Sequence, residues 1–164
     1  MSTWKACASS IVAGCVVLLC ATTTVVAQGG RPLMVVLQGN ASPAPTEDPC
    51  ILLNTETATG WAQGIGAVTW QSRETVNLCA GPDTPNVEGE FTITAASGDR
   101  LFGTYQTLAQ FDVEANEITA RGRYQAAGGT GAFDGASGEG LIGASGSLLP
   151  PFGFSGVLFG RISF

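Results

Sequence analysis

The sequence predicts an all-β fold, either a sandwich or a barrel, and three observations support this. After residue 27 there is no run of the Ala, Leu, Glu and Lys residues that favour a long helix. Short segments rich in Thr, Val, Ile and Phe are instead separated by Gly, Pro, Asn and Asp. Several of these segments alternate apolar and polar residues, as strands with one buried face do. Many short strands of this kind are typical of sandwiches and barrels.

Residues 1–27 are predicted to be a signal peptide. Lys5 gives a positively charged start, and Ile11 to Cys20 forms a short apolar core. Small residues end the segment at Val25 to Ala27, so the mature chain would begin at Gln28. We therefore expect a secreted or periplasmic protein with one domain, residues 28–164.

Two alternatives to a cleaved signal peptide remain open. An uncleaved anchor is one, because no charged residue lies between Ala6 and Ala27. Against it, the apolar core is shorter than the roughly 20 residues of a stable membrane span. A lipoprotein is the other, because Val12 to Cys15 looks like a lipoprotein cleavage box. Against that, the apolar run continues past this box.

The charge of the mature chain argues against polyanionic partners. Lys5 leaves with the leader, so six basic residues, all arginine, face 13 acidic ones, a net charge of −7. An acidic surface repels the phosphate backbone, so we expect no nucleic acid partner. Anionic membrane surfaces are disfavoured for the same reason, and we expect no stable membrane insertion of the mature chain.

Cys50 and Cys79 are the only cysteines of the mature chain, and we predict a disulfide between them. Closing a loop of about 30 residues stabilises a fold by roughly 3 kcal/mol in the chain-entropy model. Two buried free thiols are the alternative. The chain has no histidine, and two cysteines alone do not complete a tetrahedral site, so neither a metal nor a cofactor is expected.

The first half of the mature chain contains three predicted strands. Leu33 to Leu37 is the first, and it is apolar on both faces. Gln38 to Pro49 is polar and contains prolines, which predicts a loop. The next strands are Trp61 to Trp70 and Arg73 to Cys79, and Gly81 to Gly89 is predicted to be another loop.

The second half has a clearer pattern and contains five predicted strands. Residues 90–95 alternate, and Gly98 in the following turn is able to adopt a positive φ angle. The chain then returns through residues 101–110, and residues 117–126 alternate again. The five strands are Glu90 to Ala95, Leu101 to Gln110, Glu117 to Ala126, Ser137 to Ser147 and Gly153 to Phe164.

The last predicted strand is apolar on both faces. Leu158 and Ile162 lie on one face, while Val157 and Phe159 lie on the other. A strand of this kind is covered on both sides. In a barrel, the outer cover would be a helix, a loop or a partner subunit, so a homo-oligomer is one expectation.

The Gly-rich segment Gly128 to Gly138 carries the pattern Gly-Gly-Thr-Gly-x-Phe-x-x-Ala-x-Gly. This pattern resembles the corresponding segment of plant dirigent proteins, which share a fold with the allene oxide cyclases. The hairpin Phe91 to Tyr105 looks like a segment of small exported bacterial proteins with an allene-oxide-cyclase-like barrel. The resemblance covers roughly residues 88–164.

The resemblance implies an eight-stranded antiparallel β-barrel whose lumen holds one small hydrophobic molecule. It also implies a homo-oligomer, often a trimer. Dirigent proteins usually carry a reactive arginine where this chain has Ser137. The fold and the lumen are therefore expected here, but no catalytic residue is transferred.

The Gly-rich segment also has a direct structural interpretation. It lacks the Lys and Ser/Thr spacing of a phosphate-binding loop, and no helix pattern follows it. We expect a tight connection in which glycines allow positive φ angles and Phe133 plugs the barrel end. The alternative is that the segment forms a lip of the ligand pocket.

Without histidine, and without lysine after the leader, candidate functional side chains are carboxylates, arginines and tyrosines. A buried carboxylate would act as an acid or base, and paired arginines on one strand face would clamp a carboxylate. A solvated outer face or core filling is the alternative for each candidate. The candidates for ligand binding are Glu90, Tyr105, Arg121, Arg123, Tyr124 and Glu139.

Three functions are consistent with these observations. The leading hypothesis is an exported barrel that binds a small hydrophobic ligand in its lumen. The second is a dirigent- or cyclase-type enzyme that confines and guides a reactive intermediate. The third is a structural or interaction protein of the cell envelope.

Overall fold

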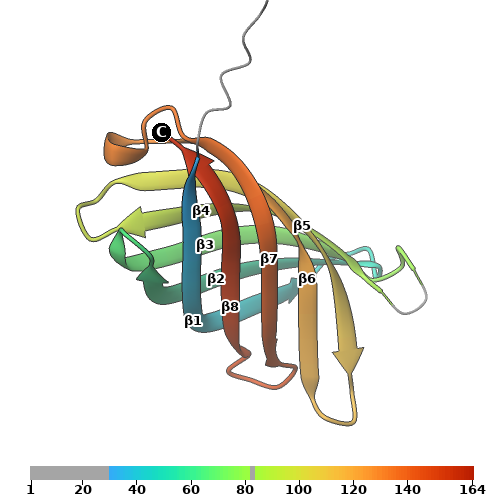
Figure 1. Ribbon diagram of the computed structural model, residues 1–164. Coiled ribbons are helices and arrows are strands. Elements are labelled where there is room, and N and C mark those ends of the chain that lie inside the picture. The colour runs from blue at the N-terminus through green and yellow to red at the C-terminus, as the bar shows by residue number, and fades with distance from the viewer. Residues whose placement is uncertain (1–29, 82–83) are drawn as a thin grey trace, which may run out of the picture.

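Eight antiparallel strands close into a barrel in the computed structural model, which describes residues 30–81 and 84–164 (Figure 1). Each strand pairs with the next, and β8 pairs with β1. The all-β class and the eight-stranded antiparallel barrel are therefore confirmed, whereas the predicted signal peptide lies outside the described residues. The strands are β1 (Arg31–Pro45), β2 (Ile51–Ala62), β3 (Gly66–Asn77), β4 (Asn86–Ala95), β5 (Arg100–Asp112), β6 (Glu117–Gly129), β7 (Ser137–Ser147) and β8 (Gly153–Ser163).

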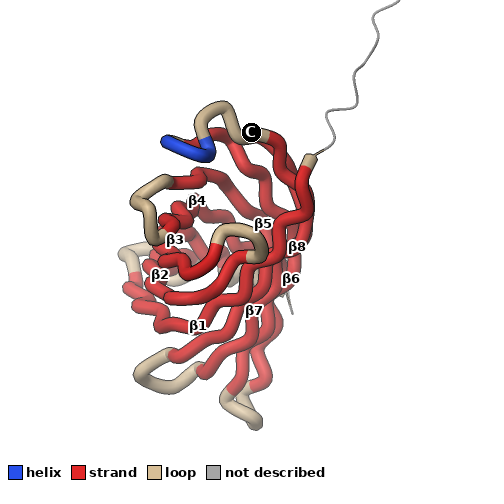
Figure 2. The backbone as a smooth tube through the Cα atoms, turned by 60° about the vertical axis from the view of Figure 1, so that its left-hand side comes forward, coloured by secondary structure: helices blue, strands red, loops and turns tan. Residues whose placement is uncertain are grey.

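The two ends of the barrel differ. The β2–β3, β4–β5 and β6–β7 connections lie at one end, together with the C-terminus and a 3₁₀ turn, η1 (Gly131–Phe133) (Figure 2). We call this the closed end, because Phe133 is buried there and its ring packs edge-on against Phe164 at 5.3 Å. The remaining four connections lie at the opposite end, which we call the open end.

Large side chains fill the barrel from its middle to the closed end. Trp70 stacks on Phe91 with ring centroids 4.9 Å apart, and Tyr124 meets Phe91 edge-on at 6.1 Å. Leu33 and Leu101 are completely or almost completely buried beyond them. Each fully buried aliphatic or aromatic side chain contributes about 1.5–3 kcal/mol, so this half holds the hydrophobic core.

The first strand is longer than predicted, and the predicted loop at residues 38–49 is wrong over most of its length. β1 continues to Pro45 and remains paired with β2 up to Leu52. Its pairing with β8 ends at Asn40, so Pro43 lies where one edge of β1 has no strand partner. Proline is tolerated at such an edge because its missing N–H is not needed there.

The second and third strands also differ from the prediction. Residues 51–62 form β2, which the sequence analysis missed, and β3 is one strand rather than two. The predicted strand at 61–70 contains a turn at residues 63–65, where Gly64 has φ 76°. The count of eight was therefore right although one strand was missed and another was divided. The predicted loop at 81–89 is likewise shorter, since β4 begins at Asn86.

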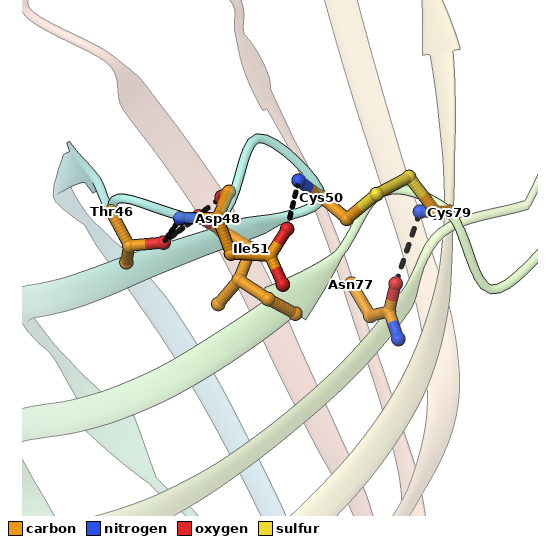
Figure 3. The surroundings of a disulfide bond; sticks show 6 residues. All are labelled: Thr46, Asp48, Cys50, Ile51, Asn77 and Cys79. Atoms are coloured by element: carbon orange, nitrogen blue, oxygen red, sulfur yellow. Dashed lines mark hydrogen bonds between the residues drawn. A yellow bond between two sulfur atoms is a disulfide. The ribbon is translucent and has the colours of Figure 1, made fainter.

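A disulfide between Cys50 and Cys79 links the β1–β2 and β3–β4 loops at the open end (Figure 3). The backbone N–H of Cys50 donates to Asp48 Oδ1 at 2.9 Å, and that of Cys79 donates to Asn77 Oδ1 at 3.0 Å. These side-chain turns fix the backbone on both sides of the bond. The predicted disulfide is confirmed, and bonds of this kind persist in oxidising compartments.

The outer surface near β8 is apolar, and six exposed side chains form it. Phe159 is 60% exposed and lies opposite Met34 on β1 and Leu141 on β7. Because these strands are neighbours in the sheet, the side chains form one continuous patch, which we call the apolar outer face. Its members are Met34, Val36, Trp61, Leu141, Val157 and Phe159.

Candidate functional site

A cavity of about 410 Å³ occupies the open half of the barrel. Its walls are mainly apolar, and all eight strands together with the β7–β8 loop contribute to them. Small side chains such as Ala120 and Ala144 leave this space, whereas aromatic rings fill the other half. Representative wall residues are Pro43, Leu52, Val76, Val87, Ile118 and Ile142.

Two carboxylates and a tyrosine lie among these apolar walls, and we call this polar group the acidic floor. Glu56 comes from β2, Glu74 from β3 and Tyr105 from β5. Strand alternation directs them inward, because Glu56 shares its face with the buried Ala58 and Glu74 shares its face with the buried Trp70.

Glu74 is held by two side-chain hydrogen bonds. Asn54 Nδ2 donates to Glu74 Oε1 at 2.7 Å, and the Tyr105 hydroxyl donates to Glu74 Oε2. Burial raises the pKa of the Tyr105 hydroxyl well above its usual range, and the nearby charges of Glu74 and Glu56 raise it further. Tyr105 therefore remains a neutral hydrogen-bond donor to Glu74.

Glu56 is held in a similar way by donors on β3. Ser72 Oγ donates to Glu56 Oε2 at 2.9 Å, and Trp70 Nε1 donates to the same oxygen at 3.2 Å. Burial raises the pKa of Glu56 from 4.5 to about 7, and repulsion from Glu74 adds to this effect. Near neutral pH, Glu56 therefore exchanges a proton easily, either as an acid or as a base.

The predicted site residues divide into two groups. Glu90, Arg121, Arg123 and Glu139 are exposed on the outer face of the barrel, away from the cavity. Their neighbours on the same strands, such as Phe91 and Tyr124, point inward instead. The four charged candidates therefore contribute nothing to the cavity wall. The proposed arginine clamp has its two side chains on one face, but that face is outside.

The two tyrosines point into the barrel. Tyr105 belongs to the acidic floor, whereas Tyr124 is buried in the packed half. The Tyr124 hydroxyl has no hydrogen-bond partner among the residues that the structure describes, and burial raises its pKa to about 12. The alternative of core filling therefore describes Tyr124, while Tyr105 takes part in a candidate binding site.

Glu56 and Glu74 are not among the site residues predicted from the sequence, although one signal for them is present. Trp70, Ser72, Glu74 and Val76 are spaced two residues apart and therefore share one strand face. Glu74 shares this face with the apolar Trp70 and Val76, and this position indicates a buried carboxylate. The predicted break between the strands 61–70 and 73–79 separates Trp70 from Glu74 and hides this shared face.

The Gly-rich segment does not form a lip of this cavity. It lies at the closed end, and the cavity walls include none of residues 128–138. Phe133 is instead buried at 2% exposure, which agrees with a tight connection that plugs the barrel.

Neither a metal cluster nor a membrane-spanning helix is found in the described chain. Within residues 30–81 and 84–164, His, Cys, Asp and Glu side chains form no group of three or more that could hold a metal ion. In the same ranges, no helix has the length and apolar character that a membrane crossing requires.

Comparisons with known proteins add no family to this description. No protein-family model, no curated protein and no solved structure matches the chain. Functional conclusions therefore depend on the geometry of the cavity.

Proposed function

We propose that this is an exported barrel that binds one small, mainly hydrophobic molecule in the open-end cavity. The observation that supports this most directly is the cavity itself, about 410 Å³ with mainly apolar walls and a polar group on one side. Ligand sites of this kind commonly have volumes of about 300–1,000 Å³ and few polar groups. The apolar walls would supply affinity, and the acidic floor would fix orientation. The resemblance to the allene oxide cyclase and dirigent barrels is consistent with this proposal.

A substitution that fills the cavity should weaken the binding of an apolar ligand. We expect N-phenyl-1-naphthylamine, a neutral apolar dye, to bind at one molecule per barrel with increased fluorescence. Ala120→Phe places a ring in the cavity and should weaken binding at least tenfold, because Ala120 lines its wall. Gln110→Phe is the matched control, since Gln110 is exposed on the neighbouring strand β5. The affinity of this control variant for the dye should be unchanged.

The proposal fails if Ala120→Phe binds the dye as tightly as the original protein while unfolding at a similar urea concentration. Ala144→Leu on β7 offers a second way to fill the same cavity if the Phe variant folds poorly. Native mass spectra of protein purified from an oxidising compartment would also reveal any molecule retained from the host.

A dirigent- or cyclase-type enzyme is the second candidate, and one observation favours it. Glu56 has a pKa of about 7 and lies in an apolar cavity beside a second carboxylate, which is a common arrangement for acid–base catalysis. Such an enzyme would release its ligand chemically changed, whereas a binding protein would release it unchanged.

Self-association through the apolar outer face is the third candidate. Charged or polar side chains normally dominate such surfaces, so exposed Phe159 and Leu141 favour a contact with a second copy of the chain. We expect sedimentation velocity to show an oligomer, and Leu141→Ser/Phe159→Ser to convert it to a monomer. Phe102→Ser, which lies away from this face, is the control and should leave the oligomer intact. If the original protein is a monomer at all concentrations, the proposal is contradicted.

A further inference from the structure

We propose that the molecule bound in the open-end cavity carries a cationic head, such as an alkylammonium group, on an apolar body. This inference rests on the proposed function, because it names the chemical class of the ligand in the same cavity. It follows from the charges of the cavity wall and from the balance of hydrogen-bond donors and acceptors at the acidic floor.

The charge of the wall favours a cation. Glu56 and Glu74 are the charged side chains that line the cavity within the described residues. An anionic head would meet these carboxylates at low dielectric without a counter-charge, which is strongly unfavourable. The arginines all lie in the described part of the chain, and all are exposed on other surfaces: Arg31, Arg73, Arg100, Arg121, Arg123 and Arg161.

The hydrogen bonds of the acidic floor lead to the same conclusion. The neutral donors in and around the floor already point at the two carboxylates: the Asn54 amide, the Tyr105 and Ser72 hydroxyls and the Trp70 indole. Glu56 Oε1 receives no hydrogen bond from any described residue, because both donors bind Oε2. The floor thus presents acceptors to the cavity, and an ammonium group supplies up to three donors and no acceptor.

Binding of a cation is expected to release a proton from the floor. The titratable groups facing Glu56 are Glu74 on β3 and Tyr105 on β5, while β1 contributes only Ala41 and Pro43 to this cavity. Among the described residues, no positive group therefore competes with the ligand. An ammonium head stabilises ionised Glu56, so affinity should rise up to tenfold per pH unit below pH 7 and level off above it.

Three probes with the same carbon chain test the inference: 1-decylamine, 1-decanol and decanoate, each below its aggregation concentration. Displacement of N-phenyl-1-naphthylamine at pH 8 should show decylamine binding at least tenfold more tightly than decanol, with decanoate weakest. Equal binding of amine and alcohol, or tighter binding of decanoate, would overturn the inference but leave the proposed function intact. Failure of the dye and of all three probes to bind would instead overturn the proposed function.

A double variant separates the floor from the net charge of the protein. Glu56→Gln/Glu74→Gln should lose the preference for decylamine over decanol while still binding the dye. Glu88→Gln/Glu90→Gln removes two exposed charges from β4 and should retain the preference. If the first variant keeps the preference, or if the second loses it equally, the cationic head is not recognised by the floor.

Discussion

Glu56→Gln is expected to stabilise the protein by about 3 kcal/mol at pH 8. Folding raises the pKa of this carboxyl from 4.5 to about 7, and each pKa unit corresponds to about 1.4 kcal/mol. Above pH 7 the folded protein must therefore hold a carboxylate that is better solvated in the unfolded chain. A neutral amide avoids this cost and still accepts the hydrogen bonds from Ser72 and Trp70.

The pH dependence has a definite sign. Below pH 4.5, Glu56 is protonated in both states, so it adds no pH dependence to stability. Between pH 4.5 and 7 the folded state keeps a proton that the unfolded state has lost, so the contribution of Glu56 to stability falls as pH rises. Above pH 7 this contribution is constant.

Urea unfolding of the original protein and of Glu56→Gln at pH 4.5 and pH 8 measures this effect. The difference between the two proteins should be small at pH 4.5 and about 3 kcal/mol at pH 8. Glu90→Gln is the control, because this carboxylate is exposed on the outer face and should change stability by less than about 0.5 kcal/mol. A difference for Glu56→Gln that does not depend on pH would show that Glu56 does not titrate in this way.

This expected gain also bears on function. A pair of carboxylates in an apolar cavity lowers the stability of the fold, and substitutions that relieve such a cost commonly reduce activity. Under the proposed function, Glu56 and Glu74 are kept because a ligand uses them. A cationic ligand would restore part of the lost stability on binding, because it binds only the folded state.

The fold could be predicted from the sequence because strand alternation is a local signal. Residues 90–110 alternate around a Gly-containing turn, and the structure forms β4 and β5 there. The predicted strand boundaries are wrong where a local sequence signal conflicts with the pairing between strands. Pro43 indicated a loop, but β1 lacks a β8 partner at that point, so proline is accommodated in the strand.

The candidate site could be predicted only in part, because the lumen is created by closure of the barrel. Alternation shows that Arg121 and Tyr124 lie on opposite faces, but it does not show which face is inside. Tyr105 was identified as a candidate from residue type alone. Its partner Glu74 is 31 residues away in the sequence, and only the β3–β4–β5 pairing brings the two together.

The close approach of β4 to Tyr105 leads to the second large expected effect: Gly89→Ala should destabilise the protein by about 4 kcal/mol. Gly89 lies directly opposite Tyr105 in the sheet, and a Cβ at residue 89 would lie 2.6 Å from the tyrosine hydroxyl oxygen. Overpacking costs about 1–3 kcal/mol. Moving the hydroxyl away from Glu74 leaves a buried carboxylate without one of its donors, which costs about 1–3 kcal/mol more.

Gly143→Ala is the matched control, since a Cβ there would lie 3.6 Å from its nearest neighbour, the Ala120 carbonyl oxygen. Urea unfolding should show that this variant lowers the free energy of unfolding by less than about 1 kcal/mol. Combining Gly89→Ala with Tyr105→Ala tests the cause, because the added methyl group would then have no ring to displace. In the Tyr105→Ala background, Gly89→Ala should cost much less than it does alone. If it costs the same in both backgrounds, the strain arises in the backbone of β4, and Gly89 has no role in positioning Tyr105 against Glu74.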